Sequence, residues 1–117
     1  MSTTKTQFLC LFRFPTEAPQ KQSSPEEMQA QYAAWTSWMA KFKEELIPGG
    51  PLKPGGVVTR GGKVTDGPYI EAKEVIASYA TIATTSLARA TEIINECPIA
   101  AHPDYSVEIR EMGYGKP

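Results

Sequence analysis

The chain has 117 residues, of which 41% are hydrophobic, with 12 basic and 13 acidic side chains and a net charge of −1. This length predicts a single domain over residues 1–117, and the hydrophobic share excludes a chain that is disordered by composition. Because no basic block stands out, the composition argues against nucleic acid and anionic membrane as partners.

The two cysteines, Cys10 and Cys97, lie far apart and lack the spacing of metal ligands. The N-terminal stretch has no long apolar region followed by a small-residue cleavage site. No apolar run approaches the roughly 18 residues that a membrane-spanning helix needs. We therefore predict packed, reduced thiols and a cytoplasmic protein without a metal site.

The first predicted elements are a strand over residues 6–14 and a long helix. The strand, TQFLCLFRF, is apolar on both faces, so we expect both faces to be covered. Ser24, Pro25 and Glu27 form a capping box with proline at the first helical position. The helix is predicted to continue to about Leu46, where the PGGP stretch of residues 48–51 stops it and begins a loop. One apolar stripe runs along it: Met28, Tyr32, Trp35, Met39, Phe42 and Leu46, with Trp38 beside it.

The second half of the chain alternates strands with one more helix. Residues 57–60 and 63–65 read as a hairpin around Gly61-Gly62. Residues 75–84 are rich in β-branched and small residues and predict a central strand. A helix from residue 85 or 86 to Pro98 follows, and residues 106–112 predict the last strand.

This order of elements predicts an α+β fold of the ferredoxin-like, split βαβ kind, with both helices on one face of an antiparallel sheet. The hairpin is expected to supply the second strand of that pattern. Because the first strand is apolar on both faces, a second subunit's sheet is the natural cover for the other face. We therefore expect a homodimer whose packed sheets form a dimeric α/β barrel.

The stretch TDGPYIEAKEVIASY, residues 65–79, resembles the YCII-related proteins, and within them the group with a DGPF motif. Tyr69 stands where that motif has Phe. SPEEMQAQYAAWTSWM, SLARATEIINECP and SVEIREM support the resemblance in the expected order. The resemblance implies a ferredoxin-like fold that dimerises by sheet packing. No motif in the sequence requires a cofactor, so none is predicted.

The resemblance also suggests where a site would lie. In the wider family a helix histidine and an aspartate near a turn are proposed as a catalytic pair, and at least one relative acts on a chlorinated, hydroxylated aromatic ring. This first helix has no histidine, while Asp66 is the counterpart of the aspartate. We predict Asp66 and His102, the only histidine, as catalytic residues. The predicted substrate-binding residues are Arg13, Tyr32, Trp35, Trp38, Tyr69, Glu71 and Lys73.

Each of these residues also has a structural interpretation. Asp66-Gly67-Pro68 is turn chemistry, Glu71 and Lys73 are a solvated pair, and the aromatic stripe is core. His102 is an exposed loop residue, and Arg13 reaches solvent. The structural interpretation leaves a structural partner for another protein, in which the DGPY segment is only a turn, whereas the functional interpretation leads to two hypotheses. The first is an enzyme that acts on a small, cyclic or aromatic organic molecule by carboxylate acid–base chemistry; the alternative is a small-molecule-binding or regulatory module without catalysis.

Overall fold

The computed structural model describes residues 5–15, 24–53, 56–66, 74–100 and 102–113, with two helices and six strands among them. The elements, in chain order, are β1 (Thr6–Pro15), α1 (Pro25–Lys41), β2 (Leu46–Pro51), β3 (Val57–Arg60), β4 (Lys63–Asp66), β5 (Glu74–Thr84), α2 (Leu87–Asn95) and β6 (Ser106–Glu111).

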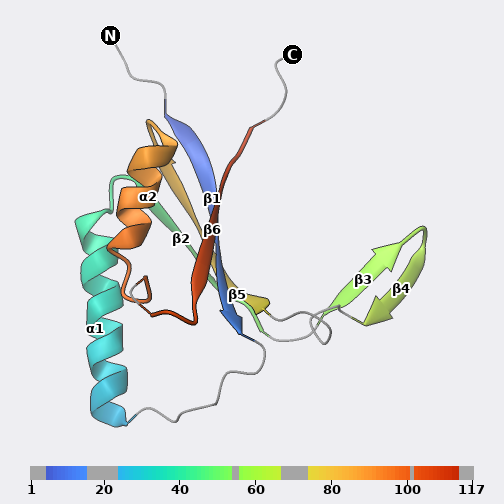
Figure 1. Cartoon of the computed structure of the whole chain (residues 1–117), viewed down its shortest axis with the longest axis horizontal. Coiled ribbons are helices and arrows are strands. Elements are labelled where there is room, and N and C mark those ends of the chain that lie inside the picture. The colour runs from blue at the N-terminus through green and yellow to red at the C-terminus, as the bar shows by residue number, and fades with distance from the viewer. Residues whose placement is uncertain (1–4, 16–23, 54–55, 67–73, 101, 114–117) are drawn as a thin grey trace.

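Four strands form one antiparallel sheet in the order β2-β5-β1-β6. Both helices lie on the same side of this sheet (Figure 1). β1 therefore separates β5 from β6, and β5 separates β1 from β2, as the split βαβ pattern requires. The observed α+β architecture, with four strands and two helices, is compatible with the predicted ferredoxin-like fold.

The core lies between the sheet and the helices. Alternate residues of β1 face it: Phe8, Cys10 and Phe12 have exposed fractions of 1%, 0% and 2%. Their cross-strand partners in β5 are Ile82, Ala80 and Ser78, which face the same way. Leu9 and Leu11 point to the other face and are half-buried. The prediction that both faces of β1 are covered is therefore confirmed for the core face, whereas the opposite face is partly open in the single chain.

The predicted end of the first helix is wrong. α1 ends at Lys41, and the amide of its C-cap residue Phe42 donates to the carbonyl of Trp38. A turn follows, and Leu46 begins β2 opposite Ile82. Leu46 continues the helical spacing of apolar residues, but it is buried as a strand residue instead. The PGGP stretch, expected as loop, belongs to β2 with a bulge between Pro48 and Gly50.

The predicted hairpin is confirmed, but its place in the fold is not the expected one. β3 and β4 pair as a separate two-stranded sheet. Gly61 and Gly62 have φ values of 58° and 82°, the left-handed conformation that a two-residue hairpin turn requires. β2, not this hairpin, supplies the second strand of the main sheet. The hairpin is an insertion between β2 and β5.

The capping box of α1 is confirmed. The Ser24 hydroxyl accepts from the Glu27 amide at 3.1 Å, and the Glu27 carboxylate accepts from the Ser24 amide at 3.4 Å. However, the first ten residues of α1, 25–34, are all exposed. Met28 is 59% and Tyr32 75% exposed, so this half of the predicted apolar stripe is not core. Figure 1 shows the reason: the N-terminal half of α1 extends past the sheet.

Candidate functional site

A cavity of about 220 Å³ lies between α1 and the β2 side of the sheet. α1 forms one wall of it, and β2 and β5 form the other. The residues around the cavity are Phe12, Trp35, Trp38, Met39, Leu46, Pro48, Gly49, Gly50, Pro51, Ser78, Tyr79 and Ala80.

The cavity exists because large and small side chains face each other across it. Trp35 and Trp38 project from α1, while β5 offers the small side chains of Ser78 and Ala80 opposite them. β2 adds Gly49 and Gly50, which have no side chain to fill the space. Close packing normally fills such space with side chains. Here the two indoles hold α1 away from the short side chains of the strand.

The aromatic wall has a fixed geometry. The rings of Trp35 and Trp38 meet edge to face, with centroids 5.4 Å apart and an interplanar angle of 83°. Trp35 meets Phe12 in the same manner at 5.9 Å. Edge-to-face contacts of this kind are favoured by the ring quadrupoles. The Trp38 N–H donates to the carbonyl of Ile93 at 2.8 Å, which orients its ring and leaves no free donor on it.

None of the described residues around the cavity is charged at neutral pH. The hydroxyl groups of Ser78 and Tyr79 are the only side-chain oxygen atoms in that set. An ion transferred to such a place would lose its hydration without a counter-charge. The described walls therefore suit an uncharged molecule with one small polar group at most.

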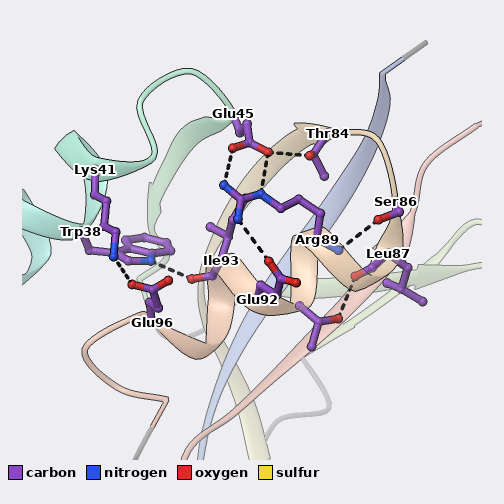
Figure 2. Close-up of polar contacts among 11 residues, drawn as sticks. Trp38, Lys41, Glu45, Thr84, Ser86, Leu87, Arg89, Glu92, Ile93 and Glu96 are labelled. Carbon is purple, nitrogen blue, oxygen red and sulfur yellow. Dashed lines mark hydrogen bonds and ion pairs between the residues drawn. The ribbon is translucent and has the colours of Figure 1, made fainter. Parts of the chain in front are cut away.

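A polar cluster at the end of α1 holds this wall in position (Figure 2). Arg89 of α2 donates to both carboxylate oxygens of Glu45, at 2.9 and 3.2 Å, and the Thr84 hydroxyl donates to Glu45 at 2.5 Å. The hydrogen bonds from Arg89 and then from Thr84 lower the pKa of Glu45. The cluster ties the turn between α1 and β2 to α2.

Two further contacts join α1 to α2. Lys41 forms an ion pair with Glu96, and Trp38 makes its hydrogen bond to Ile93 (Figure 2). All three connections lie in the C-terminal part of α1 or directly after it. Trp38 on the cavity wall is therefore held by α2 as well as by its own helix.

Some predicted binding residues lie at the cavity and others lie elsewhere. Trp35 and Trp38 line it. Tyr32 is 75% exposed and is not among the lining residues. Arg13 forms an ion pair with Glu108 of β6. Because Glu108 lies opposite Leu11 in the register, this pair belongs to the open face of the sheet. Of the predicted binding residues that the structure describes, only the two tryptophans come together at the cavity.

His102 lies in the turn before β6 and is exposed. Its ring stacks on Tyr105, with centroids 4.2 Å apart, and its Nδ1 accepts from the Asp104 amide at 3.2 Å. Asp66 ends β4, but its side chain lies outside the described part of the chain, as do Tyr69, Glu71 and Lys73. The predicted pairing of Asp66 with His102 therefore stays a prediction.

Sequence reasoning missed most of the cavity wall. Met39 and Leu46 were assigned to a continuous helix stripe, and Pro48 to a loop. The available signal was the run of small residues in β5, which predicts a close neighbour or a gap. The cysteines behave as predicted: Cys10 and Cys97 are free and buried in the core. Burial raises the pKa of each thiol to about 11, so neither is a reactive thiolate at neutral pH.

The family model of the YCII-related domain matches residues 8–112, which is most of the chain. The chain belongs to the YCII-related domain family. The match runs from β1 to the residue after β6, so it includes both helices and every described wall of the cavity. No curated protein matches this YCII-related domain. In the described part of the chain, no helix has the length and apolar character needed to cross a membrane.

Proposed function

We propose that this YCII-related domain binds a small, uncharged, largely apolar organic molecule in the cavity between α1 and the β2–β5 side of the sheet. The observation that carries the proposal is the aromatic wall of Trp35 and Trp38 facing the small residues Ser78 and Ala80. Ligand pockets are typically apolar with few polar groups. A dry cavity of about 150 Å³ is enough to hold benzene, so 220 Å³ leaves room for a substituted ring.

The chain carries its own probe for this proposal. Both of its tryptophans line the cavity, so intrinsic fluorescence reports occupancy directly. We would titrate the protein with benzyl alcohol and acetophenone, and with the charged analogues benzoate and benzylammonium. The neutral compounds should change the fluorescence and raise the unfolding temperature by several degrees at about 100 times Kd. The charged analogues should do neither.

A matched pair of variants tests the location. Ser78→Leu places a larger side chain in the cavity and should abolish both responses. Thr81→Leu changes the same strand on the opposite face and should leave both responses intact, because Thr81 pairs with Leu9 on the open face. If Ser78→Leu responds to the neutral compounds as strongly as Thr81→Leu does, the compounds bind elsewhere.

A catalytic function of the same cavity is the second candidate, with Asp66 as the acid–base carboxylate. What favours it is chain order: Asp66 ends β4, and β5 begins at Glu74 and leads to Ser78 on the cavity wall. The TDGPY stretch also supports membership of the DGPF-motif group. Once a neutral ligand is found, Asp66→Asn distinguishes the candidates: loss of turnover with retained binding indicates an enzyme, whereas no turnover in either protein indicates a binding module.

The homodimer is also a proposal, supported by the face of the sheet that the helices leave open. Leu9 and Leu11 are half-buried there, beside Tyr79, which is 40% exposed. Arg13 Nε is buried and has no hydrogen-bond partner among the described residues. A second sheet packed on this face would cover the leucines and offer acceptors to Arg13. Native mass spectrometry tests this proposal: a monomer at micromolar concentration would contradict it.

The proposed location is the cytoplasm. Its support is that Cys10 and Cys97 are both free thiols, which fits a reducing compartment. Fractionation of cells that express the tagged chain tests this location.

A further inference from the structure

Two irregularities interrupt the register of the main sheet in its described part, and both lie beside the cavity. In β5, Ala77 is an extra residue between the positions that pair with Phe12 and Arg13. In β2, Gly49 is an extra residue opposite the neighbouring stretch of β5. Bulges change the direction of nearby side chains and are common next to functional sites. The two bulges therefore mark the stretch of β5 that contains Ser78.

Ser78 presents a hydroxyl group on the cavity side of β5. Its partner Phe12 is 2% exposed and faces the helices, and cross-strand partners share a face, so the Ser78 side chain lies on that face too. Ser78 lines the cavity and is half-buried. Tyr79 pairs with Leu11, so its ring belongs to the open face of the sheet. Among the described lining residues, Ser78 thus carries the one hydroxyl group on the helix side of the sheet.

The Ser78 hydroxyl has no hydrogen-bond partner among the described residues. The buried hydroxyl of Thr84, in the same strand, is satisfied instead by Glu45. The main-chain groups of β5 point within the sheet towards β1 and β2, which flank it, rather than into the cavity. A hydroxyl group that lacks a partner in apolar surroundings costs free energy. A ligand that supplies the partner therefore gains affinity.

The unpaired groups of the walls favour a hydrogen-bond acceptor on the ligand. On the opposite wall, the Trp35 N–H has no partner among the described residues, whereas the Trp38 N–H donates to Ile93. Both unpaired groups can donate, and only the Ser78 hydroxyl can also accept. A carbonyl oxygen has two lone pairs and brings no donor of its own that would need a partner. A carboxylate would lose its hydration without meeting a counter-charge.

We infer that Ser78 determines the specificity of the cavity: its hydroxyl donates to the carbonyl oxygen of a neutral carbonyl compound whose apolar part packs on Trp35 and Trp38. This role of Ser78 rests on the proposed binding function and names the class of ligand. The opposed walls give the orientation, because the small side chains of β5 leave room for the polar end while the indoles cover the apolar part. A site built in this way rejects an analogue without the acceptor, since the hydroxyl then stays unpaired.

Acetophenone and α-methylstyrene test this role, because they differ only in the carbonyl oxygen, which a methylene group replaces in the second compound. Each is titrated into wild type and Ser78→Ala and followed by tryptophan fluorescence. The ratio of the two Kd values is compared between the compounds, so that differences in ligand hydration cancel. Ser78→Ala should raise the Kd of acetophenone about three- to tenfold. The Kd of α-methylstyrene should change much less, because this compound gives the hydroxyl no partner.

Infrared spectroscopy of the bound ketone gives a readout that a change in packing alone would not produce. A hydrogen bond lowers the stretching frequency of a carbonyl group. Acetophenone should therefore absorb at a lower frequency in wild type than in Ser78→Ala. Thr81→Val is the matched control, because it removes a hydroxyl group from the open face of the same strand, where Thr81 pairs with Leu9. It should leave the carbonyl band and both Kd values unchanged.

The possible outcomes separate this role from the proposed function. Equal Kd ratios for the two compounds, or a carbonyl band at the same frequency in wild type and Ser78→Ala, overturn the role of Ser78 and leave the proposed binding function intact. If neither compound binds to wild type, the proposed function and the role of Ser78 fail together.

Discussion

The two helices cover the same face of the sheet in different ways. α2 has nine residues and buries three of them, Ala90, Ile93 and Ile94. α1 has 17 residues and buries only Trp38. α2 approaches β5 and β6 closely, and α1 approaches no strand as closely. The small side chain of Ala90 allows the close approach, whereas the two indoles of α1 prevent it. One helix therefore seals the core and the other leaves a cavity.

The largest loss of stability is expected from a substitution in α2, the helix that seals the core. Ile93 is fully buried, so Ile93→Ala removes packed apolar volume and should lower the free energy of unfolding by about 2–5 kcal/mol. Urea unfolding followed by circular dichroism measures the loss. Leu87→Ala in the same helix is the control, because Leu87 is 53% exposed and should lose far less. Equal losses in both variants would mean that α2 does not seal the core.

The second-largest loss of stability is expected from the hydrogen bond that joins α1 to α2. Trp38→Phe keeps an aromatic ring but removes the N–H that donates to the Ile93 carbonyl, which keeps only the Glu96 amide as a donor. We expect a loss of about 1.5 kcal/mol in the free energy of unfolding, the upper range for one hydrogen bond. Trp35→Phe is the matched control, since the Trp35 N–H has no hydrogen bond to any described residue. If Trp35→Phe costs as much, ring size rather than the hydrogen bond holds α1.

The Glu45 cluster should give a smaller, pH-dependent effect. Glu45→Gln weakens the hydrogen bonds from Arg89 and Thr84, and should cost about 1 kcal/mol at pH 7. The pKa of Glu45 is lowered in the folded state from its ordinary value of 4.5. The stabilisation is therefore present above pH 4.5 and is lost as the pH falls through the lower folded pKa.

Unfolding of wild type and Glu45→Gln between pH 7 and pH 3 checks this sign. The stability difference between them should shrink towards acid pH. Glu92→Gln is the control, because the Glu92 side chain is 66% exposed and bonds Arg89 only at the surface. A difference that grows as the pH falls would contradict the assigned direction of the pKa shift.

The smallest effect is expected at the uncovered start of α1. Ser24→Ala removes the N-cap and should cost about 0.5–1 kcal/mol. Because residues 25–34 make no buried contacts, the change should appear as fraying of the first turns rather than as global unfolding. Amide hydrogen exchange of α1 measures it. Ser37→Ala, exposed in the same helix, should not increase exchange.

Local patterns allowed the sequence to determine most elements. The capping box located the start of α1, Gly61-Gly62 located the hairpin turn, and the β-branched residues located β5. These signals work because caps and turns depend on a few neighbouring residues. The family was also evident from the chain itself, since the YCII-related match agrees with the TDGPY stretch.

Tertiary packing decided what local patterns left ambiguous. Leu46 fits a helix stripe and a strand equally well by spacing, and only its pairing with Ile82 made it the start of β2. Met28 and Tyr32 carry the same helical pattern as Met39, yet they are exposed because the sheet does not extend beneath them. The cavity follows from the same cause: spacing predicts which side chains share a face, but the distance between two packed faces depends on the side chains of both.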